Sequence, residues 1–256
     1  MQKELERNGT ADRLLQVLKE NKFVLYCQAI RPLAPACHAS PYQEIFVRFV
    51  EEDQKLLPPG TFIPVLEHYE LMAVLDRWVV NRVIGWLRGR GGWEKDRDPR
   101  CSINLSGESV QNVELARFIQ RQLEACRVPP AALSFEIAEA DFVEHVGAVA
   151  DIISMLGPLG CGFALSGYSG AIIPCGTLKE IGFDAVKIDG DIIRRIHRDR
   201  FSLALAKMII DRCRELGMFS VGECVENPEI LETLRALRAD YAQGFGIERP
   251  GPLEKA

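Results

Sequence analysis

The chain has few of the features that would assign a function class at once. Its eight cysteines form no C-x-x-C pair and no zinc-like spacing, so neither a structural zinc site nor a dithiol redox motif is expected. It has no apolar run of about 18 residues that could cross a bilayer. It also has no excess of basic residues, since the net charge is -5, and this argues against a nucleic-acid surface. The remaining class is an ordinary globular protein, with 47% hydrophobic and 26% charged residues.

Two further features bear on the setting of the protein. Several cysteines lie inside apolar runs and are typical of small core residues, and no signal-peptide pattern is present. We therefore expect a reduced, cytoplasmic setting, either for this chain alone or as the cytosolic part of a larger, membrane-anchored protein. The one basic run, over residues 194–200, is expected to be a solvated helix end.

The order of apolar segments predicts one α/β domain. A polar lead-in over residues 1–10 precedes a single expected domain over 11–256, which starts with a helix at 11–21. Strands are expected at 23–31 and 42–50, joined by a Pro- and Ala-rich loop as an antiparallel hairpin. Helices follow from residue 61 and over 71–87. Further strands are expected at 101–105, 133–137, 162–165, 184–188, 218–222 and 240–243, and helices at 108–126, 139–156, 201–216 and 227–237. This alternation predicts a TIM-like (β/α)8 barrel whose first strand is antiparallel.

Polar residues end most of these short strands. They are Asn104, Glu136, Lys187, Glu223 and Gln243, while Glu44, Phe46 and Arg48 share one face of the second strand. The carboxyl ends of parallel strands converge on one face of a barrel, so the pattern predicts a shared site. An oxygen-rich cage of this kind suits magnesium or manganese, and two such ions can activate water against a phosphodiester. The strand at 162–165 differs, because it ends in Ser166 and Gly167 without a charge.

Nine short motifs in this order resemble the EAL-domain family, the cyclic-di-GMP phosphodiesterases of bacterial signalling. The motifs are LYCQAI (25–30), EIFVR (44–48), LPPGTFIPVLEH (57–68), DRWVV (76–80), INLS (103–106), FEIAEA (135–140), VKID (186–189), VGECVE (221–226) and DYAQGF (240–245). The resemblance extends from about residue 11 to 252. It implies the EAL type of barrel and cyclic-di-GMP as ligand. Members of the family use magnesium or manganese.

The resemblance also assigns roles to single residues. Glu44, Asn104, Glu136 and Glu223 match metal-ligand positions, Lys187 matches the lysine near the catalytic water, Glu226 a supporting carboxylate, and Gln243 a site glutamine. Gln28, Arg48 and Asp76 match positions that contact the nucleotide, where an arginine suits a phosphate and a carboxylate suits the N–H edge of a guanine.

The chain departs from the family at the end of its fifth expected strand, at 162–165. The family has two adjacent aspartates there, followed by Phe-Gly-Thr-Gly, and a gapless count places Ser166 and Gly167 on the aspartates. Residues 168–171 then replace the following loop. Serine is a poor neutral ligand and glycine has no side chain, so we expect no catalytic residue pair and no bound metal. Ile45 and Phe46 replace the alanine and leucine of the family signature, which is a milder change.

Several alternatives remain at this point. Lys187 either contacts the ligand or forms a structural ion pair with Glu136 or Glu223. Arg48 either binds the nucleotide or forms a salt bridge with a neighbouring glutamate at 51 or 52. Asp76 either contacts the nucleotide or is a helix-face charge beside the next arginine.

Three functions follow from these alternatives. The leading hypothesis is an inactive EAL-like domain that acts as a cyclic-di-GMP receptor and signals to a partner protein or a neighbouring domain. The second is a protein-interaction module that binds no nucleotide, and the third is a weak phosphodiesterase. A homodimer is compatible with each.

Overall fold

Eight strands close into a barrel in the part of the chain that the structure describes, because β1 pairs with both β2 and β9. The structure is a computed structural model that describes residues 22–33, 41–50, 55–90, 93–94 and 98–253. The strands of the barrel are β1 (Phe23–Pro32), β2 (Tyr42–Val50), β4 (Arg100–Leu105), β5 (Leu133–Ala138), β6 (Gly162–Tyr168), β7 (Ala185–Ile188), β8 (Phe219–Gly222) and β9 (Tyr241–Ala242). The predicted TIM-like barrel is therefore confirmed.

The direction of the first strand is also confirmed. β1 is antiparallel to β2 and to β9, whereas the pairs from β2 through β4 to β9 are all parallel. Two short strands extend this sheet: β3 (Leu56–Leu57) pairs with β2, and β10 (Gly251–Pro252) pairs with β1. The parallel strands therefore place their carboxyl ends on a common rim, where the polar residues at the strand ends meet.

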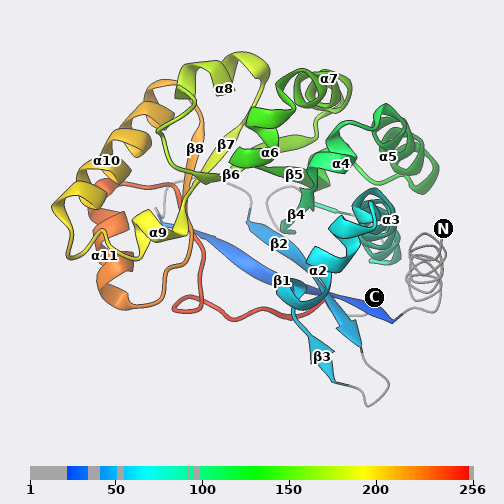
Figure 1. The fold of residues 1–256 in the computed structure, drawn as a ribbon, viewed down its shortest axis with the longest axis horizontal. Coiled ribbons are helices and arrows are strands. Elements are labelled where there is room, and N and C mark those ends of the chain that lie inside the picture. The colour runs from blue at the N-terminus through cyan, green and yellow to red at the C-terminus, as the bar shows by residue number, and fades with distance from the viewer. Residues whose placement is uncertain (1–21, 34–40, 51–54, 91–92, 95–97, 254–256) are drawn as a thin grey trace, which may run out of the picture.

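Helices surround the barrel, as Figure 1 shows for α3, α5, α7, α8, α10 and α11. Their bounds are α2 (Pro59–His68), α3 (Met72–Gly89), α4 (Gly107–Val110), α5 (Val113–Cys126), α6 (Glu139–Glu144), α7 (Val146–Leu156), α8 (Cys175–Ile181), α9 (Gly190–Ile193), α10 (Arg200–Glu215) and α11 (Pro228–Leu237); two 3-10 turns lie at Pro130–Ala132 and Gly157–Leu159. The apolar faces of these helices pack on buried strand residues such as Ile103, Phe135 and Val186, which form one continuous core.

Two of the predicted helices are each divided in two. The helix expected at 108–126 breaks because Asn112 accepts a hydrogen bond from Glu114 N and starts α5 anew. The helix expected at 139–156 breaks at His145, whose backbone is not helical (φ -129°, ψ 37°). The expected helix at 11–21, the lead-in at 1–10 and most of the Pro-rich loop lie outside the described residues. None of the helices in the described part of the chain combines the length and hydropathy that crossing a bilayer requires.

Candidate functional site

A buried lysine lies at the centre of the rim where the parallel strands end. Lys187, on β7, is only 2% exposed. Its Nζ lies 2.8 Å from Glu44 Oε2, 2.6 Å from Glu136 Oε2 and 3.1 Å from Glu223 Oε1. These glutamates come from β2, β5 and the residue that follows β8. One ammonium group therefore bridges three carboxylates, and we call these four residues the carboxylate cage.

Strand register explains why these distant residues meet. Asn104 on β4 lies opposite Glu136 on β5, and Lys187 on β7 lies opposite Val221, two residues before Glu223. Side chains alternate between the two faces of a strand, so residues at matching register points face the barrel interior together. The predicted convergence of these strand-end residues is confirmed, and Lys187 forms ion pairs with both of the expected glutamates and with Glu44.

Amide side chains continue the cage toward β1. Glu44 accepts hydrogen bonds from Asn104 Nδ2 (2.8 Å) at Oε1 and from Gln243 Nε2 (2.7 Å) at Oε2. Gln243 Nε2 also lies 3.1 Å from Gln28 Oε1, and Gln28 Nε2 donates to the Glu248 carbonyl at 2.6 Å. Both carboxylate oxygens of Glu44 are thus occupied. Gln243 Oε1, by contrast, is buried and has no hydrogen-bond partner among the described residues.

The electrostatics of the cage follow from its burial. Burial alone lowers the pKa of Lys187, but the charges of Glu136, Glu44 and Glu223 outweigh it and hold that pKa well above its usual range. Burial also opposes ionisation of Glu44, yet Lys187 and the two amides lower its pKa overall. Burial and the Glu44 charge raise the pKa of Glu136 to about 7, with Lys187 acting in the opposite direction. Burial raises the pKa of Glu223 as well. The ammonium is therefore charged at neutral pH, and burial opposes ionisation of Glu136 and Glu223 more than that of Glu44.

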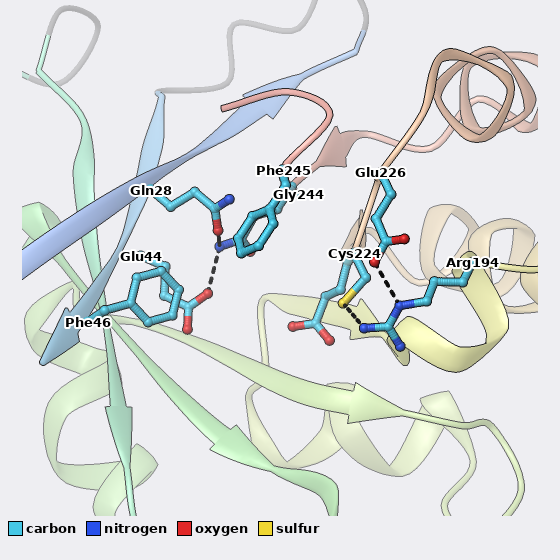
Figure 2. A pocket seen from close by; sticks show the side chains of 10 residues that line it. Gln28, Glu44, Phe46, Arg194, Cys224, Glu226, Gly244 and Phe245 are labelled. Atoms are coloured by element: carbon cyan, nitrogen blue, oxygen red, sulfur yellow. Dashed lines mark hydrogen bonds and ion pairs between the residues drawn. The ribbon is translucent and has the colours of Figure 1, made fainter. Parts of the chain in front are cut away.

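A cavity of about 280 Å³ lies beside the cage and shares Glu44 and Glu223 with it. Figure 2 shows the side chains that line this cavity. Its lining residues combine three acids, two amides, two aromatic rings and one guanidinium. They are Gln28, Glu44, Phe46, Arg194, Glu223, Cys224, Glu226, Gln243, Gly244 and Phe245. The Phe245 ring is 60% exposed at the mouth. Such a wall offers acceptors for N–H and O–H groups together with flat apolar surface for a ring system.

Comparison with known proteins identifies the family of this barrel. The family model described as the EAL domain matches residues 11–250. The chain belongs to the EAL-domain family.

The relatives of this EAL domain are larger proteins. The chain is 33% identical over 244 residues to a protein of Shewanella oneidensis named cyclic di-GMP phosphodiesterase PdeB, covering 95% of this chain and 28% of that protein. It is 30% identical to cyclic di-GMP phosphodiesterase PdeF of Escherichia coli, covering 99% of this chain and 33% of that protein. The chain therefore spans about a third or less of these curated relatives.

Solved structures give the same result for the fold. The FimX EAL domain of Pseudomonas aeruginosa, described as bound to c-di-GMP, superposes with a TM-score of 0.84 at 26% identity, over 93% of this chain and 94% of that chain. A Xanthomonas citri FimX EAL domain in complex with c-diGMP gives a TM-score of 0.87 at 21% identity, over 98% of this chain and 96% of that chain, which shows the shared fold.

The donor set of this EAL domain does not fit a divalent cation as it is arranged. Among the residues described, no three His, Cys, Asp or Glu side chains are grouped so that they could hold a metal ion. The Lys187 ammonium is bonded to three of the carboxylates that would be the ligands, and its charge opposes a second cation beside it. Ser166 and Gly167, at the end of β6, bring no compensating acid, and Gly167 has a left-handed backbone (φ 64°) within a register shift of the strand.

The loop that follows β6 has its own anchors, which the sequence did not reveal. Glu139 Oε2 accepts hydrogen bonds from the Ser169 backbone N (3.2 Å) and Oγ (2.8 Å). The buried Tyr168 hydroxyl donates to the Ile173 carbonyl at 2.5 Å. Hydrogen bonds of Tyr168 and Ser169 within this domain therefore hold the segment that differs from the family.

Two expected nucleotide contacts lie outside the residues that line the cavity. Asp76, on α3, is 5% exposed and its Oδ2 accepts from Ser106 N (2.9 Å), Ser106 Oγ (2.7 Å) and Ser109 Oγ (2.7 Å). Burial raises the pKa of Asp76 to about 6, although these donors oppose the shift. Asp76 thus organises the start of α4, and its contact with a guanine stays a prediction. The alternative, a charge on the exposed face of a helix, is wrong because Asp76 is buried.

Arg48 lies further along β2 than the cavity wall. Its guanidinium carbon is 5.4 Å from the Tyr26 ring centroid and 5.7 Å from that of Phe46, and Nη1 donates to the Val47 carbonyl at 2.9 Å. The alternative partners at 51 and 52 lie outside the described residues. Because Phe46 itself lines the cavity, Arg48 is one side chain removed from it.

Glu226 and Arg194 form the opposite wall of the cavity. Glu226 Oε1 accepts from Arg194 Nε at 3.1 Å, so the expected supporting carboxylate is paired with a guanidinium. Arg194 lies at the end of α9 and is 43% exposed, as expected for a solvated helix end, but it also lines the cavity, which the sequence did not indicate. Its position depends on the turn between β7 and α9, for which the sequence carries no spacing signal.

Proposed function

We propose that this EAL domain is a cyclic-di-GMP receptor that does not hydrolyse its ligand. The observation that carries this proposal is the end of β6, where Ser166 and Gly167 stand at the positions of the two aspartates that the family resemblance expects. The three glutamates at expected metal-ligand positions are instead bonded to the Lys187 ammonium. Ser166 and Gly167 add no acid to activate a water molecule. Removing one catalytic group from a coupled set costs orders of magnitude in rate, so the joint change leaves little activity.

The residues that line the cavity support the proposal that the domain still binds cyclic-di-GMP. Gln243 Oε1 is buried without a partner, and a buried acceptor of this kind is ordinarily satisfied by a ligand or by water. Gln28 and Glu226 add polar groups, and the Phe46 and Phe245 rings add apolar surface for a base. The relatives named as cyclic di-GMP phosphodiesterases and the c-di-GMP-bound FimX domain make this dinucleotide the preferred ligand.

Binding in this proposal needs neither magnesium nor manganese, because the cage already holds its cation. The signal passes to a partner protein or to a neighbouring domain in the cytoplasm. A neighbouring domain is in keeping with relatives that are about three times as long as this chain. A homodimer remains a prediction that the mass of the protein in solution decides.

The test is isothermal calorimetry with cyclic-di-GMP in EDTA, on the wild type and on Arg48→Ala. The wild type gives a saturable heat, and the variant binds roughly ten-fold or more weakly because a charge-assisted contact to a phosphate is lost. Arg117→Ala is the control, since Arg117 is an exposed arginine on α5 paired with Glu114. Circular dichroism verifies that each variant is folded.

Two results contradict the proposal. Silence of the wild type at high micromolar ligand removes the receptor and leaves the nucleotide-independent interaction module, whose partner binding Arg48→Ala leaves intact. Formation of linear product with manganese, lost in Glu44→Ala, identifies a weak phosphodiesterase instead.

A further inference from the structure

The charged residues in the wall of the cavity beside the cage are mainly acidic, and this would repel a ligand that carries phosphate groups. Glu44, Glu223 and Glu226 all line it, and the Lys187 ammonium is already bonded to three carboxylates. A cyclic dinucleotide carries two phosphate charges, so an acidic wall repels it unless a cationic group with unused N–H donors faces it. Of the described residues that line the cavity, Arg194 is the basic one.

Arg194 is held in place by three hydrogen bonds, one from each of its nitrogens. Nε donates to Glu226 Oε1 (3.1 Å), Nη1 to Asp191 Oδ1 (2.9 Å), and Nη2 to Cys224 Sγ (3.3 Å). A guanidinium has five N–H groups, so these contacts leave one N–H on each terminal nitrogen. The side chain is 43% exposed. Figure 2 shows the guanidinium turned toward Cys224 and Glu226. A fixed fork with two remaining donors is the geometry that binds a phosphate bidentately.

The backbone around Arg194 is adapted to this arrangement. Cys224 has a left-handed backbone (φ 54°), which is uncommon for a residue other than glycine. A side chain at Gly190 would place its Cβ 2.5 Å from Cys224 Sγ and 3.7 Å from Arg194 Nη1. The thiol therefore occupies the space that a side chain at 190 would need, and it packs against the guanidinium. Strained positions of this kind tend to gather at functional sites.

From these contacts we propose that Arg194 binds a phosphate of the cyclic dinucleotide, and that its two unused N–H groups supply at the cavity the cationic donors that Lys187, bonded to three carboxylates, cannot. This inference rests on the proposed receptor function and deepens it. The Glu226 carboxylate acts as a positioning residue, because it fixes the Nε edge of the guanidinium and leaves the terminal nitrogens toward the cavity.

The experiment measures cyclic-di-GMP binding by calorimetry in EDTA for the wild type, Arg194→Gln, Arg194→Lys and Arg198→Gln. Arg194→Gln raises the Kd roughly ten- to hundred-fold, as expected for loss of a charge-assisted hydrogen bond. Arg194→Lys recovers part of the affinity, because it keeps the charge and loses the fork. Arg198→Gln removes the same charge from an exposed residue in the same segment and leaves the Kd unchanged.

The phosphorus-31 spectrum of the bound ligand separates a phosphate contact from a contact to the base. At saturating ligand, one bound phosphate resonance shifts in Arg194→Gln and stays in place in Arg198→Gln. Circular dichroism and thermal unfolding confirm that the exposed substitutions leave the fold intact.

The outcomes distinguish this inference from the receptor function. If the wild type binds and Arg194→Gln binds equally well, Arg194 has no such role and the receptor function stands. If Arg194→Gln lowers the affinity but shifts no phosphorus resonance of the bound ligand, Arg194 contacts the base and the phosphate assignment is wrong. If the wild type itself does not bind, both the function and this inference fall.

Discussion

Replacing Lys187 by methionine removes the one ammonium group of the carboxylate cage and keeps a side chain of similar length. In the wild type this ammonium is bonded to Glu44, Glu136 and Glu223, and its raised pKa keeps it charged at any pH near neutrality. The variant leaves these acids buried without their partner. Breaking a buried ion pair from one side typically costs about 3–5 kcal/mol. We expect a loss of this size in the free energy of unfolding at about pH 8.

The loss should depend on pH in a definite direction. In the variant, the unpaired carboxylates lose their unfavourable buried charge when they bind protons. Each pH unit changes the free energy of protonating one of them by about 1.4 kcal/mol. Their pKa values in the folded variant lie above the values in the unfolded chain. Stability is therefore retained at low pH and lost as pH rises through the folded-state values. Lys187 does not titrate in this window, so the acids alone set the slope.

Urea unfolding at about pH 5.5 and about pH 8 measures this effect as the difference between variant and wild type. Lys179→Met, an exposed lysine on α8, is the matched control and should change little at either pH. Adding Glu136→Gln to the variant should recover part of the loss at the higher pH. An equal loss at both values, or a negligible loss at about pH 8, would refute the assignment of Lys187 as the internal cation of the cage.

Two further predictions concern the surroundings of the site. Burial raises the pKa of Asp76 to about 6, so the Asp76 contribution to wild-type stability should fall as pH rises from about 4 to about 6. The stability of Asp76→Asn relative to the wild type should therefore rise over that window by about 3 kcal/mol; a pH-independent difference in chemical unfolding would contradict this. Gly244→Ala places a Cβ 2.2 Å from the Val225 backbone N and should destabilise the domain severely, by about 4 kcal/mol or more. Gly147→Ala, with open space on α7, is its control, and equal melting temperatures of the two variants would count against this geometry.

Much of the fold could be predicted because the barrel strands from β4 onward are short apolar runs separated by helical sequence. The predicted strands from 101–105 to 240–243 are all present, with ends that differ by a few residues. Helix interruptions could not be predicted in the same way. The apolar periodicity continues through Asn112 and His145, while the breaks depend on a local cap and on one non-helical backbone conformation. The short helices α8 and α9 were missed because one or two turns give too little periodicity.

The site was predictable in its membership and not in its contacts. Strand-end positions sufficed to bring Glu136, Lys187 and Glu223 to one rim, since register fixes which residues share the interior. The sequence could not decide between an ion pair and a ligand contact for Lys187, because that depends on side-chain distances of a few ångström. The place of Arg194 at the cavity was missed for a related reason: it belongs to a basic run, and its contacts with Glu226 and Cys224 depend on side-chain positions that the sequence does not show.

The central claim, that this EAL domain keeps its dinucleotide and does not cut it, has one direct measurement. The protein is incubated with cyclic-di-GMP in manganese buffer and in EDTA, separated from free ligand, and the nucleotide released from it is identified by chromatography. The account predicts intact cyclic dinucleotide, in equal amounts from both buffers. Linear product from the manganese sample, or protein that carries no nucleotide from either buffer, would contradict it.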